Sequence, residues 1–244
     1  MEPISFWHRL TDMVAPRSCE ICGCRLSVSE SLLCPVCDLQ LPRTAFAASP
    51  YHNEMAKMLW GKMTVERVAA LFYYAPRSEV AEAVYRLKYA RNDRLPFLWG
   101  QRCAREMAAT GFVNPADGKP ATFFDGIDVL IPMPLTPRRE RERGYNQSRE
   151  MAKGIAEVTG IAIRDNVVER ISFKESQTQK HLWTRQENVE GAFTLRQTEG
   201  MEGRHALVID DILTTGATVC ALAHELSAIP NLTVSVLTLG FSKH

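Results

Sequence analysis

The chain alternates short apolar runs with segments in which apolar residues recur every three or four positions. The runs carry β-branched and aromatic residues and predict buried strands, whereas the wider spacing predicts helices. The predicted strands are residues 68–75, 126–135, 162–171, 205–210 and 232–241, and the predicted helices are residues 78–90, 95–111, 148–160 and 217–226. This alternation predicts an α/β fold, a mostly parallel sheet with helices on both faces.

Some helix ends carry their own signals. Ser78 precedes the first predicted helix, where its hydroxyl can accept a hydrogen bond from a free backbone N–H group. Gly111 and Gly160 stand where the second and third helices are predicted to stop, because glycine readily adopts the left-handed conformation that ends many helices.

Length and composition limit the class of protein. The 244 residues suffice for one large α/β domain and a small appendage. A net charge of +1 gives no overall attraction for nucleic acid or membranes, although a local charged patch remains compatible with it. Neither a signal peptide nor an apolar run of membrane-spanning length, about 18 residues, is found, so we expect a cytoplasmic protein without a membrane span.

Five of the seven cysteines fall within residues 19–37. Cys19 and Cys22 form one C-x-x-C pair, and Cys34 and Cys37 form another. Two such pairs can place four thiolates around one structural zinc ion, with no open position for catalysis. The alternative, disulfide-paired or free cysteines, is disfavoured because so short a segment lacks a core of its own. Cys24 could replace Cys22 in the ligand set.

Small residues and prolines between residues 42 and 53 are typical of a linker. We therefore expect an N-terminal zinc-knuckle domain in residues 1–45 and a larger domain in residues 46–244. Cys103 and Cys220 lie in apolar helical contexts within the larger domain and are expected in the core.

Residues 206–218, ALVIDDILTTGAT, connect a predicted strand to a predicted helix. Ligands of such sheets bind beyond the carboxyl ends of the strands, which is where Asp210 and Asp211 are expected. The helix begins near Ala217, and its free N–H groups favour an anion. Gly216 lets the backbone approach a ligand, and hydroxyl donors are supplied by Thr214, Thr215 and Thr218.

Two carboxylates would repel a phosphate, but they can accept hydrogen bonds from sugar hydroxyls or help to hold a cation. The predicted ligand therefore has a phosphate at one end and a diol beside it, as in a ribose 5-phosphate. The alternative is a capped turn whose acids are solvated. No lysine follows the glycine, so the segment is not a Walker A loop.

Residues 136–147 hold four arginines and two glutamates, a local charge of +2. Arginine offers paired donors to phosphate, and Arg143 is favoured because it precedes Gly144, where the chain can bend toward a ligand. The alternative is a solvated helical turn with Glu–Arg pairs, which is favoured for Arg139 and Arg141.

The motif VIDDILTTGAT resembles the phosphoribosyl-diphosphate signature of type I phosphoribosyltransferases. Residues 132–148 are similar to the pyrophosphate-side segment of the ComF family, and residues 177–193 are similar to its flexible-loop region. The positions in register are Gln177, Arg185, Asn188, Val189 and Phe193. ComF proteins also carry an N-terminal cysteine knuckle domain. Thr136 and Lys174 depart from the family pattern, in which His and Thr are expected.

The resemblance implies a type I phosphoribosyltransferase-like fold that binds phosphoribosyl diphosphate with Mg²⁺. The 5-phosphate would lie on residues 214–218, including Ala217, and the ribose at Asp210 and Asp211. Arg143 would assist catalysis and Arg138 would bind substrate. Transfer to an unidentified nitrogen acceptor would release diphosphate.

A hood within about residues 51–111 would receive the acceptor, and no motif there identifies it. Lys88 and Tyr89, at the end of a predicted helix, are candidates for this hood. A lysine that interacts with the helix dipole is an equally good interpretation.

ComF-type proteins are associated with competence and DNA uptake, which gives an alternative function. The chain could bind single-stranded nucleic acid and keep the phosphoribosyl site for regulation or as a vestige. Bases would then stack on aromatics such as Trp7, Trp60 and Trp183, although the near-neutral charge argues against this alternative. A transcription regulator is a third alternative, but the sequence shows no helix-turn-helix signal.

Overall fold

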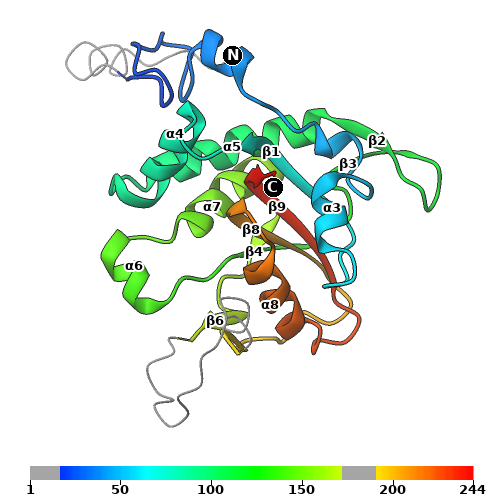
Figure 1. Ribbon diagram of the computed structural model, residues 1–244. Helices are drawn as coiled ribbons and strands as arrows, with labels where there is room; N and C mark the ends of the chain where they lie inside the picture. Colours follow the sequence, from blue (N-terminus) through cyan, green and yellow to red (C-terminus); the bar gives the residue numbers. More distant parts are fainter. Residues whose placement is uncertain (1–16, 172–190, 244) are drawn as a thin grey trace.

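The structure is a computed structural model that describes residues 17–171 and 191–243. A five-stranded sheet with the order β1-β9-β8-β4-β5 forms its centre, and every neighbouring pair of strands is parallel. Its strands are β1 (Val68–Tyr74), β4 (Val129–Pro132), β5 (Ala162–Ile163), β8 (His205–Leu213) and β9 (Thr233–Ser242). The predicted α/β fold class is thereby confirmed (Figure 1).

Helices cover the sheet because each crossover between parallel strands must return over one face. The helices of the described residues are α2 (Pro35–Gln40), α3 (Glu54–Leu59), α4 (Glu79–Tyr89), α5 (Arg94–Ala109), α6 (Pro137–Arg143), α7 (Gln147–Thr159) and α8 (Ala217–Leu226), of which α2 belongs to the N-terminal cysteine segment. The crossover from β4 to β5 contains α7, and the crossover from β8 to β9 contains α8. These crossovers leave in opposite directions across the sheet, so right-handed connections put α7 and α8 on opposite faces.

Local signals explain several helix ends. Ser78 caps α4, and its hydroxyl accepts a hydrogen bond from the N–H of Ala81 at 3.2 Å. Gly160 ends α7 in the left-handed conformation, with φ of 74°. The helix predicted to stop at Gly111 ends at Ala109 instead.

Two antiparallel hairpins flank the central sheet. One pairs β2 (Gly111–Val113) with β3 (Pro120–Thr122), and the other pairs β6 (Val168–Arg170) with β7 (Phe193–Leu195). The prediction of one strand over residues 162–171 was wrong, because a turn at Asp165 and Asn166 divides the segment into β5 and β6. This apolar run therefore serves two different sheets.

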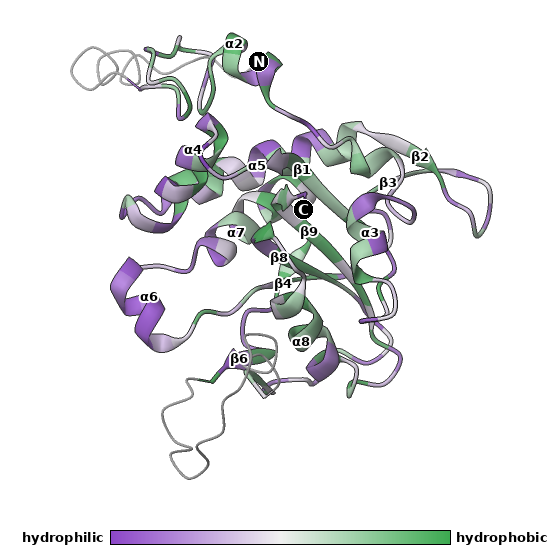
Figure 2. Ribbon diagram, viewed as in Figure 1, coloured by the Kyte–Doolittle hydropathy of each residue, from purple (hydrophilic) through white to green (hydrophobic). Residues whose placement is uncertain are grey.

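The core follows the strands, which form the green centre of the hydropathy view (Figure 2). Trp99 of α5 is fully buried and packs edge-on against Phe72 of β1, with ring centroids 5.7 Å apart. Glycines allow α5 and α7 to touch backbone to backbone. A Cβ added to Gly100 would lie 2.2 Å from the carbonyl oxygen of Met151, and one added to Gly154 would lie 2.1 Å from that of Phe97.

The cysteine unit, defined as residues 17–41, is tied to the larger part by ion pairs. Arg86 of α4 lies 3.5 Å from Glu20, and Arg43 bridges Asp38 and Glu106 at 2.9 Å each. Buried side chains form one continuous cluster across both parts. The boundary at residues 45 and 46 stays a prediction.

The hood expected within residues 51–111 contributes β1 to the central sheet and α5 to the layer packed on α7. The helix α4 of the same region extends toward α6 (Figure 1). Within the described residues, no helix has both the length and the apolar character needed to cross a membrane.

Candidate functional site

The two acids lie near the carboxyl end of β8, where its neighbour β4 has already ended. Pro132, the last residue of β4, is in register with Ile209, so Asp210 and Asp211 follow directly beyond it. The crossovers after β4 and β8 diverge at this point, which makes it the topological switch point of the sheet. Ligands of open α/β sheets bind at such points.

Asp210 is buried, with 9% of its surface exposed. Its Oδ1 accepts hydrogen bonds from the Ser148 hydroxyl at 3.2 Å and from the Asp211 N–H at 2.8 Å. Burial, followed by the neighbouring charge of Asp211, raises the pKa of Asp210 to about 7. A carboxyl group with this pKa exchanges its proton near neutral pH.

Asp211 is 5% exposed and has a cationic partner. Lys88 Nζ lies 3.0 Å from its Oδ2, and Gln147 Nε2 donates to the same oxygen at 3.2 Å. Oδ1 accepts from the Ile212 N–H at 2.8 Å. Lys88, one of the residues proposed for the hood, is thus brought to the acids.

The first turn of α7 supplies the polar partners of both acids. Asn146 caps this helix: its Oδ1 accepts from the Ser148 N–H at 3.0 Å, and its Nδ2 donates to the Met133 carbonyl at 3.0 Å. The cap ties α7 to the residue after β4 and so directs Gln147 and Ser148 toward β8. These two residues were missed from the sequence, although an Asn before an apolar-periodic helix is a recognisable N-cap signal.

The loop between β8 and α8 has the form expected for an anion site. Thr214 and Thr215 are exposed and Thr218 is half-buried. The N-cap residue of α8 is Gly216, which has no side chain to cap the helix, and the Ala217 N–H donates to Thr215 Oγ1 at 3.4 Å. Gly216 has φ of 80°, and a Cβ at this position would lie 2.8 Å from Leu59 Cδ2. The loop therefore presents hydroxyls and, after Ala217, the free N–H groups of the first turn of α8 beside the acids.

The two arginines selected from α6 lie in different surroundings. Arg143 Nη1 donates to Gln147 Oε1 at 2.7 Å, so it reaches Asp211 through Gln147. Arg138 pairs with Glu142 at 2.7 Å on the exposed side of α6, as the Glu–Arg alternative described. Among the described residues the structure gives it no contact with the acids.

A cavity of about 380 Å³ adjoins the carboxyl end of β4 and extends to β6. Arg170 lines it beside Pro132 and Asn146, and its guanidinium lies 5.3 Å from the centre of the Phe193 ring. Burial lowers the pKa of Arg170, while the charge of Asp210 acts in the opposite direction. Sequence reasoning missed Arg170, which gave no signal inside an apolar strand pattern.

The cysteine unit gathers five thiols. Those of Cys19, Cys22, Cys24 and Cys34 lie within 4.8 Å of one another. Cys37 adjoins them, because its N–H donates to Cys34 Sγ at 3.5 Å. Burial and hydrogen bonds with the neighbouring thiols raise the pKa of the Cys37 thiol.

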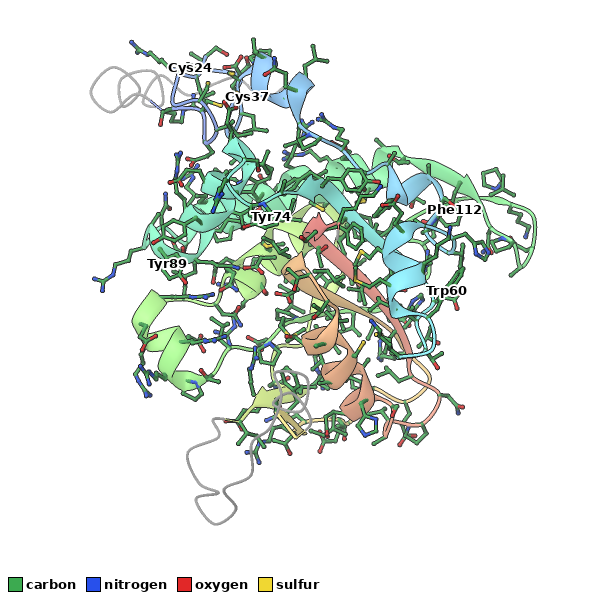
Figure 3. All side chains as sticks on the ribbon, in the orientation of Figure 1. Cys24, Cys37, Trp60, Tyr74, Tyr89 and Phe112 are labelled. Atoms are coloured by element: carbon green, nitrogen blue, oxygen red, sulfur yellow. The ribbon has the colours of Figure 1, made fainter. Side chains whose placement is uncertain are left out.

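The compact set differs from the predicted ligand set in one member, since it contains Cys24 instead of Cys37 (Figure 3). The alternative in which Cys24 replaces Cys22 also differs, because both thiols belong to the compact set. A tetrahedral site with Zn–S bonds of about 2.3 Å requires sulfurs about 3.8 Å apart. Cys22 and Cys34, at 3.7 Å, already satisfy this spacing.

The other predicted positions are placed as follows. Cys103 is fully buried, as expected, and Cys220 is half-buried in α8. Phe193 is buried in β7. Outside the described residues lie Trp7, Lys174, Gln177, Trp183, Arg185, Asn188 and Val189.

No family model matches the chain. It is 25% identical over 236 residues to DNA utilization protein YhgH of Salmonella typhimurium strain LT2, which covers 93% of this chain and 98% of that protein. It is 24% identical over 208 residues to the Escherichia coli K12 protein of the same name, covering 85% and 83%. Competence protein F of Haemophilus influenzae is 29% identical over 116 residues, covering 47% and 51%. These relatives confirm the resemblance that the motifs predicted.

Two solved structures are similar to the chain at a remote level. The allosteric regulatory enzyme of purine biosynthesis has a TM-score of 0.39 and 16% identity, covering 63% of this chain and 30% of that one. Trypanosoma cruzi hypoxanthine phosphoribosyl transferase has a TM-score of 0.35 and 18% identity, covering 61% and 66%. The chemistry of the site must therefore follow from its own residues.

Proposed function

We propose that the protein binds phosphoribosyl diphosphate with Mg²⁺ and transfers the phosphoribosyl group to a nitrogen acceptor. The observation that carries this proposal is the pairing of two buried carboxylates with the N-terminus of α8 at the switch point of the sheet. Carboxylates accept hydrogen bonds from hydroxyls and coordinate cations, and free backbone N–H groups donate hydrogen bonds to a phosphate. A phosphorylated sugar has both kinds of group in one molecule.

The phosphate end of the ligand would lie on residues 214–218. The exposed hydroxyls of Thr214 and Thr215 and the N–H groups of Thr218 and Val219 are available there as donors. Gly216 is needed because a side chain would meet Leu59 and because its φ is positive.

The ribose hydroxyls would donate hydrogen bonds to Asp210 and Asp211. Lys88 now holds Asp211 Oδ2 at 3.0 Å, so a hydroxyl at that oxygen competes with the ammonium group. Ser148 and Gln147 keep the carboxylates in position while that exchange occurs. Substrate binding would therefore move the last turn of α4.

The acid pair also fits a hard cation, because Asp210 has no ion-pair partner among the described residues and carboxylate oxygens are preferred magnesium ligands. When bound, Mg²⁺ would offset the charge of the diphosphate. Arg143, which donates to Gln147, and Arg170, which lies within the electrostatic influence of Asp210, would stabilise the charge that develops on this leaving group. The bond between the anomeric carbon and the diphosphate would break with its electron pair going to the diphosphate oxygen. The lone pair of the acceptor nitrogen would form the new bond to the anomeric carbon, and the nitrogen would then lose a proton to water.

We further propose that the cysteine unit holds one structural zinc ion. Three ligands, Cys19, Cys22 and Cys34, are shared by the predicted and the compact sets, and the fourth is Cys37 or Cys24. The names of the relatives support a role in DNA utilization or competence, in which the acceptor would belong to nucleic-acid metabolism.

Calorimetry with phosphoribosyl diphosphate and MgCl₂ tests binding, and diphosphate release with a pool of nucleobases and amines tests transfer. The double variant Asp210→Asn/Asp211→Asn should bind weakly and release no diphosphate while keeping a folded circular dichroism spectrum. Asp117→Asn, in the exposed turn between β2 and β3, is the control and should behave as wild type. Absence of binding heat, or unchanged turnover in the double variant, would overturn the proposal.

A further inference from the structure

The cysteine unit holds one thiol more than a tetrahedral zinc ion can bind. The thiols of Cys19, Cys22, Cys24 and Cys34 lie within 4.8 Å of one another, and the N–H of Cys37 donates to Cys34 Sγ at 3.5 Å. A structural zinc ion takes four thiolates. One of the five thiols therefore stays outside the metal while it lies next to thiolates that bind it.

The five thiols differ in their exposure. Cys19, Cys34 and Cys37 are buried, whereas Cys22 and Cys24 are exposed. The unit projects beyond α4 from the rest of the protein, so solvent reaches its outer edge (Figure 1). Because accessible thiols oxidise first, an oxidant in solution meets Cys22 and Cys24 before the other thiols of the unit.

The chain between the two exposed thiols allows them to approach. Gly23 alone separates them, and their sulfurs lie within 4.8 Å of each other. A disulfide needs the sulfurs to be about 2 Å apart. Gly23 has φ of 72°, and a Cβ added to it would meet no atom within 4 Å, so the turn has room to adjust. The resulting disulfide would close a short, exposed ring, and disulfides of this kind are readily reduced.

We propose that Cys22 and Cys24 form a reversible, peroxide-sensitive switch that releases the zinc ion, an inference that rests on the proposed zinc site. Hydrogen peroxide oxidises the Cys24 thiol to a sulfenic acid and releases one water molecule. The Cys22 thiolate then attacks the Cys24 sulfur, the S–S bond forms, and the departing hydroxide takes a proton from solvent to give a second water molecule. The two thiols lose two electrons, which the peroxide gains.

The disulfide removes zinc ligands. Cys22 belongs to both the predicted and the compact ligand sets, so at most three thiolates, those of Cys19, Cys34 and Cys37, remain for the metal. A short segment of this kind depends on its metal for folding. Its contacts with the larger part, such as that of Glu20 with Arg86 at 3.5 Å, would loosen when zinc leaves. Peroxide would thereby control how the cysteine unit is held against α4.

The test uses the full-length, zinc-loaded protein, and its zinc content is measured before hydrogen peroxide is added. A chromophoric chelator then follows the released zinc. Wild type should lose its zinc ion, and dithiothreitol with added zinc should restore it. Cys24→Ser keeps the four predicted ligands and should release zinc several-fold more slowly, because one exposed thiol is missing. Cys220→Ser removes a half-buried thiol outside the unit and should release zinc as wild type does.

Peptide mapping identifies the bond that forms. Trypsin places the five thiols on two peptides, residues 18–25 and residues 26–43. In peroxide-treated wild type, fragmentation mass spectrometry should show an internal disulfide between Cys22 and Cys24 in the first peptide, with Cys19 still open to alkylation. A disulfide to either thiol of the second peptide would instead link the two peptides.

Three results would overturn the proposal: zinc retained by wild type at a peroxide concentration that oxidises free cysteine; equal rates of zinc release in Cys24→Ser and wild type; or a disulfide that links the two peptides. The zinc content before peroxide separates failure of the zinc site from failure of the switch. A protein without zinc at that stage contradicts the proposed zinc site, and peptide mapping still shows whether Cys22 and Cys24 form the bond.

Discussion

Lys88 Nζ lies 3.0 Å from Asp211 Oδ2 and links the last turn of α4 to the carboxyl end of β8. The residues are 123 positions apart in the sequence, so no local sequence pattern predicts that they form a pair. The ammonium group also lowers the pKa of Asp210, against the stronger effects of burial and of the Asp211 charge. Lys88 therefore pairs with one carboxyl group and helps to set the pKa of the other, Asp210.

Replacing this lysine should change the titration of Asp210. In Lys88→Met the pKa of Asp210 should rise above about 7, because a favourable positive charge is removed. Side-chain carboxyl ¹³C NMR across a pH series measures the shift. Lys57→Met, on an exposed position of α3, is the control. An unchanged or lower Asp210 pKa in Lys88→Met would contradict this role.

The raised pKa of Asp210 also predicts a pH-dependent stability. Between the ordinary value of 3.8 and about 7 the folded protein binds more protons at this site than the unfolded chain. The free energy of unfolding should therefore fall as the pH rises through this window. Asp210→Asn should remove that part of the slope and be more stable at pH 8, by on the order of a few kcal/mol.

Urea unfolding without Mg²⁺ at pH 5 and pH 8 measures this difference. Asp117→Asn should keep the wild-type slope, because that carboxyl group lies in an exposed turn. If Asp210→Asn is no more stable than wild type at pH 8, then burial of the charged Asp210 carboxylate does not lower the free energy of unfolding, and the prediction is wrong.

Gly216→Ala should damage both the fold and the anion site. A left-handed alanine costs about 1–2 kcal/mol, and its Cβ would also lie 2.8 Å from Leu59 Cδ2. Gly200 has a similar φ of 72° and open space around it, so Gly200→Ala shows the backbone cost alone. Thermal unfolding should rank Gly216→Ala below Gly200→Ala, and calorimetry should show weaker phosphoribosyl diphosphate binding only in Gly216→Ala. Equal behaviour would remove the loop from the proposed phosphate site.

Five thiols beside one another provide a spare fourth ligand for zinc. Cys24→Ser and Cys37→Ser should each retain one zinc ion per chain, because the remaining thiol completes the site. The double variant should lose the metal, as should Cys19→Ser, which removes a thiol shared by both sets. Metal analysis with a chromophoric chelator measures the content. Zinc loss in one single variant would instead identify that cysteine as the obligatory fourth ligand.

Much of the fold was predictable because apolar spacing is a local property. The strands β8 and β9 and the helices α4, α7 and α8 lie close to their predicted bounds. Short elements such as α2, α3 and the β2–β3 hairpin were not predicted, since each contains too few residues for a periodic pattern. The α6 segment was ambiguous because its charges suited a phosphate or a solvated helix, and Figure 2 shows it as a hydrophilic helix.

The candidate site was predictable only along one segment of the chain. Residues 210–218 are contiguous, so their acids, glycine and hydroxyls were visible together. Gln147 and Ser148 reach the acids only after α7 packs against β8, and Arg170 of β6 interacts electrostatically with Asp210 only in the folded protein. Their roles depend on tertiary contacts, which a single sequence does not contain.

The backbone contact between α5 and α7 restricts how the candidate site could be remodelled for another ligand. Any larger residue at Gly100 or Gly154 would wedge the two helices apart and draw the capped turn of α7 away from the carboxylates. Substitutions that change ligand specificity are therefore poorly tolerated between α5 and α7. They are better tolerated on α4, whose outer surface is exposed to solvent. Directed evolution of ligand choice should accordingly accumulate its substitutions on α4 and leave the two glycines untouched.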